Sequence, residues 1–455
     1  MLHPTLLLRR ASFHAFNPST TAHTARFVIR AASVSSLNNT TPMTVSAAVA
    51  THPPNPPPPL LSVAPMMDWT DLHYRQLARL LSKNVWLYTE MVVDATLLHT
   101  ADLDRFLWFP PEQHPIVCQL GGSNPESLAK ACQIVAQYGY DEINLNCGCP
   151  SDRVAGAGCF GAAMMLRPDN VGACCAAMAA AVQGTPITVK CRIGVDEVDS
   201  YEALHQFVAV VSASSPVTHY VIHARKCLLK GLSPAQNRSI PPLRYQWVWA
   251  LKRDFPHLQF TLNGGVTTPG EVAAALSLQN SDGSGGVAGV MVGRAAYHDP
   301  WGVLANADVT VWGEKENPGG SRRQVLYEYA KYADGMVGRW GVKEDGYRMP
   351  SVRTLTKPLL GMFHQVPRGK KWRAAVDAAV RDAESVKEVL DRTLHVLLPE
   401  TLDAPPGVVS EEEGDEDVVV VLPHYVADEM PVCVNGAAAA AGGGGEERGE
   451  TVATI

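Results

Sequence analysis

Reactive and polar side chains recur in this sequence directly after short apolar runs. A thiol (Cys149), an amine (Lys190) and an imidazole (His223) each follow such a run, and so do amide and guanidinium groups. These groups can donate protons, stabilise negative charge and hydrogen bond a polar ligand. The full set is Met66, Asp68, Glu90, Gln119, Asn146, Cys149, Lys190, Arg192, His223, Arg225, Asn263 and Arg294. Because most of these residue types are hard to explain as core, they indicate a functional site.

Eight apolar or β-branched runs carry these residues and alternate with helix-like stretches. The runs are LLSVAPM from Leu60, LYTEMV from Leu87, PIVCQLG from Pro115, EINLNCG from Glu142, ITVKCRIG from Ile187, HYVIHAR from His219, QFTLNGG from Gln259 and GVMVGRA from Gly289. Eight strand and helix units in about 250 residues predict an α/β fold, a TIM (β/α)8 barrel, with its active site at the carboxyl ends of the strands. A doubly wound sheet is the alternative, but no G-x-G-x-x-G follows the first run.

The ends of the 455-residue chain differ in composition from its middle. Residues 1–58 contain four arginines and no acidic residue and end in HPPNPPPP, which predicts a transit peptide and a stiff proline-rich linker. We therefore expect a chloroplast or mitochondrial protein, or a cytoplasmic form that starts at Met43. Residues 401–455, with 12 acidic residues and one basic residue, predict a disordered acidic and Ala/Gly-rich tail.

Two further segments lie between these ends. Residues 59–320 contain the eight runs and are predicted to form the barrel. Residues 321–400 lose the strand pattern, have apolar positions at helical spacing, and carry 15 Lys or Arg against 10 Asp or Glu. We predict a basic helical domain there, so the net charge of −7 does not exclude a nucleic-acid partner.

The cysteines and the apolar runs exclude some other classes of protein. Ten cysteines without regular spacing indicate reduced thiols rather than a disulfide scaffold. Cys147 and Cys149 form a C-x-C pair with no second pair at ligand spacing, so we expect no metal. No uninterrupted apolar run reaches about 18 residues, so we expect no membrane span.

Nine motifs along the chain resemble those of one known family. They are APMMDWTD (64–71), YTEM (88–91), QLGG (119–122), DEINLNCGCPSDRV (141–154), VKCRIG (189–194), IHARK (222–226), GLSPAQNR (231–238), NGG (263–265) and MVGR (291–294). Taken together, and in this order, they resemble the tRNA-dihydrouridine synthases of the bacterial A-type branch. The resemblance covers residues 60–395 and implies an FMN-dependent oxidoreductase that uses NADPH to reduce a uridine of the tRNA D-loop, near position 20.

The resemblance implies an FMN site at the mouth of the barrel. The glycine turns after the seventh and eighth strands and Arg294 would hold the phosphate, since glycines let backbone amides approach an anion. Lys190 would stabilise negative charge on the reduced ring, with Gln119 and His223 as further hydrogen-bond partners. The predicted cofactor residues are Pro65, Met66, Met67, Gln119, Lys190, His223, Asn263, Gly264, Gly265, Gly293 and Arg294. Ordinary glycine turns and a satisfied buried histidine are the alternative interpretation of these positions.

A catalytic acid must complement the flavin, because reduction of uracil needs a hydride at C6 and a proton at C5. The resemblance assigns the proton to Cys149, in the GCPS motif, as a general acid. Residue type alone does not separate Cys149 from Cys147, which occupies a position where relatives have an apolar residue and is interpreted as packing. Cys159 is a weaker candidate.

The RNA would be held by residues around the mouth and on the helical segment. Asn146 matches a family position that touches the target base, and the predicted contacts to tRNA are Asn146, Arg153, Arg238, Arg353 and Lys357. Arg192 is a further candidate near the mouth. Solvated surface charge is the alternative for each cation. Two departures from the family pattern, Ala235 and Lys357, concern the choice of uridine and do not touch the chemistry.

Two other functions fit the same residues. The first is an FMN-dependent barrel oxidoreductase that acts on a free small molecule and does not need a basic helical domain. The second is a non-catalytic tRNA-binding protein on a barrel scaffold, which would bind no flavin. We expect a monomer.

Overall fold

The structure, a computed structural model, describes residues 56–150, 160–407, 422, 424–425 and 430–433. Residues 1–55 of the predicted leader, including Met43, lie outside the described residues, as do Arg153, Cys159 and most of the acidic tail. Within the part of the chain that is described, no helix combines the length and the apolar character needed to cross a bilayer.

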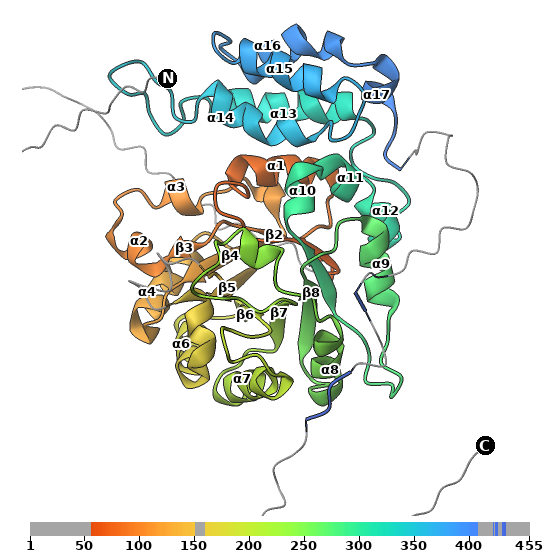
Figure 1. Cartoon of the computed structure of the whole chain (residues 1–455). Coiled ribbons are helices and arrows are strands. Elements are labelled where there is room, and N and C mark those ends of the chain that lie inside the picture. Colours follow the sequence, from red (N-terminus) through yellow and green to blue (C-terminus); the bar gives the residue numbers. More distant parts are fainter. Residues whose placement is uncertain (1–55, 151–159, 408–421, 423, 426–429, 434–455) are drawn as a thin grey trace, which may run out of the picture. The chain divides into compact units, whose positions relative to one another are not determined.

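The strands form one parallel sheet in which neighbours along the chain pair with each other. They are β1 (Leu61–Val63), β2 (Leu87–Tyr88), β3 (Val92–Val93), β4 (Ile116–Gly121), β5 (Glu142–Cys147), β6 (Ile187–Arg192), β7 (His219–His223), β8 (Gln259–Asn263) and β9 (Gly289–Val292). The order is β1-β9-β8-β7-β6-β5-β4-β2, and β3 also pairs with β4. All eight predicted runs therefore contain strands. The second run is split into β2 and β3, which Figure 1 labels.

The sheet closes on itself between its first and second runs. Trp86, just before β2, accepts a hydrogen bond from the Val63 amide at 2.9 Å and donates one to the Leu61 carbonyl at 3.0 Å. A parallel bridge joins Ser62 to Trp86. The fold is thus a (β/α)8 barrel, and the predicted TIM barrel with a helical carboxyl-terminal region is confirmed.

Helices follow the strands and pack around them (Figure 1). In the barrel they are α1 (Leu72–Leu81), α2 (Asp94–His99), α3 (Asp104–Leu107), α4 (Pro125–Ala136), α6 (Pro168–Ala181), α7 (Tyr201–Ser214), α8 (Gln246–Asp254), α9 (Pro269–Ser277), α10 (Arg294–His298), α11 (Pro300–Leu304) and α12 (Ala307–Trp312), with short 3-10 turns at Pro111–Gln113, Gly161–Leu166 and Gln236–Arg238. Local sequence fixes several starts. Asp71 caps α1 by accepting from the amides of His73 and Tyr74, and Thr268 with Glu271 forms a capping box on α9.

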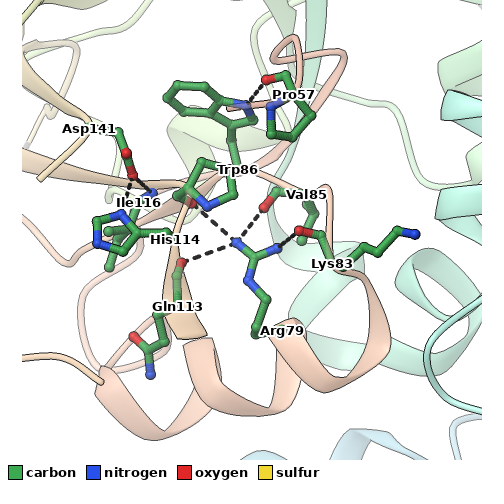
Figure 2. A network of polar contacts seen from close by, with 10 residues as sticks. Pro57, Arg79, Lys83, Val85, Trp86, Gln113, His114, Ile116 and Asp141 are labelled. Carbon is green, nitrogen blue, oxygen red and sulfur yellow. Dashed lines mark hydrogen bonds and ion pairs between the residues drawn. The ribbon is translucent and has the colours of Figure 1, made fainter. Parts of the chain in front are cut away.

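Charged groups at the amino ends of the strands are held by hydrogen bonds to the backbone and to a histidine (Figure 2). Arg79 of α1 is buried, and its two terminal nitrogens donate to the carbonyls of Ser82, Lys83, Val85, Gln113 and Pro115. The carboxylate of Asp141 binds the His114 ring at 2.7 Å and accepts from the Ile116 amide at 2.6 Å. These contacts join the loops that precede β2, β4 and β5, so this end of the barrel is a structural network.

The carboxyl-terminal segment is helical, and it contacts the barrel at α1, α10 and α11. It contains α13 (Arg322–Met336), α14 (Val352–Thr356), α15 (Gly369–Ala379), α16 (Val386–Thr393) and α17 (Pro399–Asp403), with 3-10 turns at Lys357–Gly361 and Leu394–Val396. Helix α13 packs on α1, and Tyr332 hydrogen bonds His73 at 3.0 Å. Arg322 donates to the Met362 carbonyl and stacks over Trp301, with its Cζ 4.5 Å from the ring centre.

Candidate active site

One cavity opens where the carboxyl ends of the strands meet. Every residue predicted to bind the cofactor lines it, together with Cys149, Asn146 and Arg238. Arg353 and Lys357 do not line it; they border a separate groove on the helical segment. The barrel thus brings fourteen predicted residues together, because strands in parallel register end at the same level.

Cys149 sits on a loop that Asn146 holds in place. The side-chain oxygen of Asn146 accepts from the amides of Gly148 and Cys149, both at 3.0 Å. Its nitrogen donates to Gln119, whose own nitrogen donates to Asn144, at 2.8 and 2.9 Å. Asn146 and Gln119 are both buried. Here they act as supports of the Cys149 loop, and the predicted contacts of Asn146 with a base and of Gln119 with a cofactor stay predictions.

The two thiols of the C-x-C pair differ in access. Cys149 is half-buried and lines the cavity, whereas Cys147 is fully buried among the side chains of the core. Burial raises the pKa of the Cys147 thiol well above its usual value, and neighbouring thiols add to this effect. A group that donates a proton to a ligand must reach it, and of this pair only Cys149 lines the cavity.

Lys190 presents its amine to the cavity from the end of β6. The amine donates to the Asn263 side chain at 2.8 Å, and Asn263 in turn donates to the Met291 carbonyl at 2.7 Å. Burial, with a smaller effect of Arg192, lowers the pKa of Lys190 to about 7. An anion in the cavity would favour the protonated, positively charged form of the Lys190 amine. The site therefore favours a ligand that carries negative charge.

His223 has a nitrogen without a protein partner. Its Nδ1 atom is buried and forms no hydrogen bond with any of the described residues. Burial and the charges of Arg192 and Lys190 hold the pKa of this imidazole well below its usual value, so the ring is neutral at physiological pH. A buried, unpaired ring nitrogen is costly unless a ligand supplies its partner.

The turn after β8 can only be built from glycines. Gly264 and Gly265 have φ values of 109° and 83°, in the region that favours glycine. A Cβ atom on Gly265 would lie 2.5 Å from the Tyr245 hydroxyl oxygen and 2.6 Å from Leu243 Cδ1. Tyr245 also donates to the Gly264 carbonyl at 2.5 Å, which fixes the turn at the edge of the cavity.

The charges around the cavity have one sign. Lys190, Arg192, Arg238 and Arg294 line it, and none of the described lining residues is acidic. Arg294 follows β9 and donates to the Arg238 carbonyl at 2.9 Å. A concave site with this lining selects an anionic ligand.

Arg192 supports the loop that carries Cys149, and its predicted contact with RNA stays a prediction. It is buried, and it donates to the carbonyls of Gly148, Lys226 and Asn237 at 2.9, 3.1 and 2.9 Å. It therefore ties the Cys149 loop to the loop that follows β7. Asn237, which sequence reasoning passed over inside GLSPAQNR, secures that second loop by bonding both the amide and the carbonyl of Leu228.

The fold and the site together define a class: a TIM-barrel enzyme with a cationic cavity, a neutral histidine and an accessible thiol at its carboxyl end. A family model described as dihydrouridine synthase matches residues 62–397. The tRNA-dihydrouridine(20/20a) synthase of Vibrio cholerae is 43% identical over 334 residues, which cover 73% of this chain and 95% of the relative. Proteins of the same name are 45% identical over 340 residues in Xanthomonas axonopodis pv. citri and 43% identical over 334 residues in Synechocystis sp., each covering 73% of this chain and 93% of the relative.

The chain belongs to the dihydrouridine synthase family and is an oxidoreductase. The resemblance drawn from the nine motifs is thereby confirmed.

Proposed function

We propose that this protein is a tRNA-dihydrouridine synthase that uses FMN and NADPH to reduce a D-loop uridine, at position 20 or 20a. The names of its relatives support tRNA as the substrate and 20/20a as the position. The observation that carries the chemistry is the cavity itself, in which a half-buried thiol adjoins a cationic, glycine-edged pocket.

The residues present fit a flavin mononucleotide. The buried, unpaired Nδ1 atom of His223 needs a polar partner, and Gly264 and Gly265 line the cavity with backbone that no side chain covers. Arg294 offers a fork of donors beside that turn, as a phosphate site requires. Lys190 would face negative charge on the ring, and Pro65, Met66 and Met67 would pack against its apolar part.

The chain's own residues would orient the uracil and supply its proton. When bound, FMN supplies the hydride that reaches C6. Cys149 gives its proton to C5, and the thiolate regains a proton from solvent. Asn146 and Arg192 hold the loop that carries Cys149, so the thiol is positioned before the base arrives.

The helical segment and the mouth would hold the RNA. Taking a uridine out of the stack costs about a few kcal/mol, which phosphate contacts must offset. Arg353, Lys357 and Arg238 are exposed and suit this role. Arg153, outside the described residues, is proposed on its sequence position alone. We also propose a monomer directed to a chloroplast or mitochondrion by residues 1–58.

The test is nucleoside mass spectrometry of unmodified tRNA incubated with the protein, FMN and NADPH. Wild type should form dihydrouridine, and Cys149→Ala should lose about 10²–10⁴-fold in rate, the usual contribution of a general acid. Cys147→Ala is the matched control and should retain product. Loss of product in Cys147→Ala but not in Cys149→Ala would overturn the assignment of the acid.

The same assay distinguishes the two alternatives. An enzyme for a free small molecule would reduce free uridine or a related pyrimidine in preference to tRNA. A non-catalytic tRNA-binding protein would bind tRNA and take up no flavin.

A further inference from the structure

A second cavity, of about 600 Å³, adjoins the first. The two share Met67 and Met91 as lining residues, so one side of the flavin pocket is also a wall of the second cavity. Met67 is 57% exposed. The other walls come from the β2–β3 turn, the start of α1, the α3 region and the segment between α13 and α14.

Aromatic side chains from two parts of the chain face this cavity. Trp108 follows α3, and Trp340 follows α13; their ring centres are 6.3 Å apart in an edge-to-face arrangement. The guanidinium of Arg339 stacks over Trp108, with its Cζ 3.9 Å from the ring centre. Arg339 does not line the cavity; it covers one face of Trp108 and holds that ring in place. Flat aromatic surfaces are what proteins use to hold unstacked nucleobases.

Two of the aromatic rings are only partly covered by the protein. Phe106 and Tyr347 line the cavity and are 39% and 47% exposed. Packing does not explain them, since core aromatic residues in the described part of this chain, such as Trp249 and Trp372, are fully buried. Large apolar surface left open in a concave site marks a place where a ligand binds.

The cavity also offers an acceptor that can read a base edge. Glu90, from the YTEM motif, lines it, and burial and the nearby Asp71 raise the pKa of its carboxyl group. Asp71 is occupied as the cap of α1. A carboxylate accepts from the ring N–H and amino groups of a base. Glu90 was singled out in the sequence and has no part in the flavin site.

We propose that the second cavity receives the base of another nucleotide of the substrate RNA, close to the target uridine on the same strand, stacked on the aromatic walls and carrying an amino donor for Glu90. This rests on the proposed function, because it takes RNA as the substrate. Two neighbouring bases turned out of the stack fill two adjoining cavities, and each contributes to the affinity that offsets unstacking.

The reductant is a poorer fit to this cavity. A nicotinamide dinucleotide carries several negative phosphate charges. The cavity is lined by two acidic residues, Asp71 and Glu90, as well as by two arginines, Arg75 and Arg105. The guanidinium of Arg75 is engaged, because its Nε donates to Gln113 and its Nη1 to the Thr70 carbonyl. The balance of charge therefore favours a neutral base over a polyanion.

The test combines a protein variant with altered RNA. Phe106→Ala with Tyr347→Ala removes the two partly exposed rings, and Val309→Ala, at a 36% exposed apolar residue on α12, is the matched control. The substrates are unmodified tRNA transcripts and transcripts with one abasic nucleotide, placed in turn at each position flanking the target uridine. Affinity is measured by fluorescence titration, which needs no turnover, and dihydrouridine formation is measured separately.

The double variant should bind tRNA about tenfold more weakly, because stacking of a base on aromatic rings is worth about 1–3 kcal/mol. One abasic position should weaken wild type to the same degree and have no further effect on the variant. Additive losses at every position would overturn the proposal. So would unchanged tRNA affinity with slower reduction of the flavin by NADPH, which would assign the cavity to the reductant. Absence of dihydrouridine from wild type, with the coupling in affinity intact, would instead reject the proposed function.

Discussion

The two ends of the barrel both bury charged side chains, but they treat those charges differently. At the amino end, the terminal nitrogens of Arg79 reach five backbone carbonyls, of which Figure 2 labels those of Lys83, Val85 and Gln113. At the carboxyl end, the amine of Lys190 bonds one side chain among the described residues, and His223 keeps a buried nitrogen unpaired. The Nε atom of Arg79 is also without a partner among the described residues, but both terminal nitrogens of its guanidinium are bonded to the backbone, which stabilises the fold. His223, in contrast, lines the cavity, where a ligand can supply the partner of its ring nitrogen. The difference therefore separates a stability end from a functional end.

The largest expected effect is at the amino end. Arg79→Met should lower the free energy of unfolding by about 3–5 kcal/mol, since several buried carbonyls lose a charged donor. FMN affinity of the folded protein should not change. Arg323→Met is the control: this arginine pairs with Asp403 at the surface, and its loss should cost less than about 1 kcal/mol. Denaturant titration followed by circular dichroism measures both, and equal losses would remove the distinction between the sites.

A smaller effect is expected from the glycine turn at the carboxyl end. Gly265→Ala places a methyl group against Tyr245 and Leu243 at a positive φ, which together cost about 2 kcal/mol or more. FMN affinity should fall at least about tenfold, because the turn must move. In Gly313→Ala the φ is also positive, at 68°, but the methyl group meets nothing within 4 Å. That variant should retain FMN affinity. The same affinity in both variants would contradict a role of the Gly264-Gly265 turn in FMN binding.

The pH dependence of FMN binding tests the charge on Lys190. Its pKa is lowered to about 7 in the free protein, and bound FMN, an anion, should hold the proton on. Affinity should therefore fall as pH rises above 7, by up to about tenfold per pH unit. Lys190→Met should flatten this profile. A profile in wild type that does not change between pH 6 and 9, roughly the range in which this proton is lost, would contradict the assigned pKa shift.

The stability of the flavin-free protein should depend on pH in the opposite direction and rise as pH rises. Because the folded pKa lies below the ordinary value of 10.5, the unfolded chain binds the extra proton between about pH 7 and 10.5. Burying the charged amine destabilises the fold below that window, and this cost disappears as pH rises through it. His223 stays neutral throughout, because its pKa is well below its usual value.

The smallest effect is expected on the helical segment. Arg353→Ala and Lys357→Ala should each weaken tRNA binding by about two- to fivefold and reduce its salt dependence by about one counterion. FMN affinity should be unaffected. Lys387, exposed and paired with Asp391 on α16, is the matched control. Equal losses in all three variants would indicate a general effect of positive charge rather than specific phosphate contacts by Arg353 and Lys357.

The sequence predicted the strands and the site from one physical regularity. Runs such as ITVKCRIG are too apolar for a surface, and the polar residues that end them converge when parallel strands end together. The regularity does not extend to side-chain direction. Arg192 was placed near the mouth by its position in the sequence, and only the structure shows that its guanidinium bonds three backbone carbonyls.

Contacts between distant segments were beyond sequence reasoning. Lys357 was predicted to meet phosphate; it also donates to the Asp68 carbonyl at 2.6 Å, across 289 positions of the chain. The second cavity depends on Trp108 and Trp340 meeting, and no local pattern marks that pair. The strand spacing equally gave no warning that the second run would break into β2 and β3.

The most direct measurement is titration of the purified protein with FMN, followed by the absorbance and fluorescence of the flavin. The cationic carboxyl end predicts saturation at one FMN per chain, with bleaching of the bound flavin when NADPH is added. Protein that is folded by circular dichroism but binds no FMN would contradict the claim that the unpaired groups at this end are kept for a flavin.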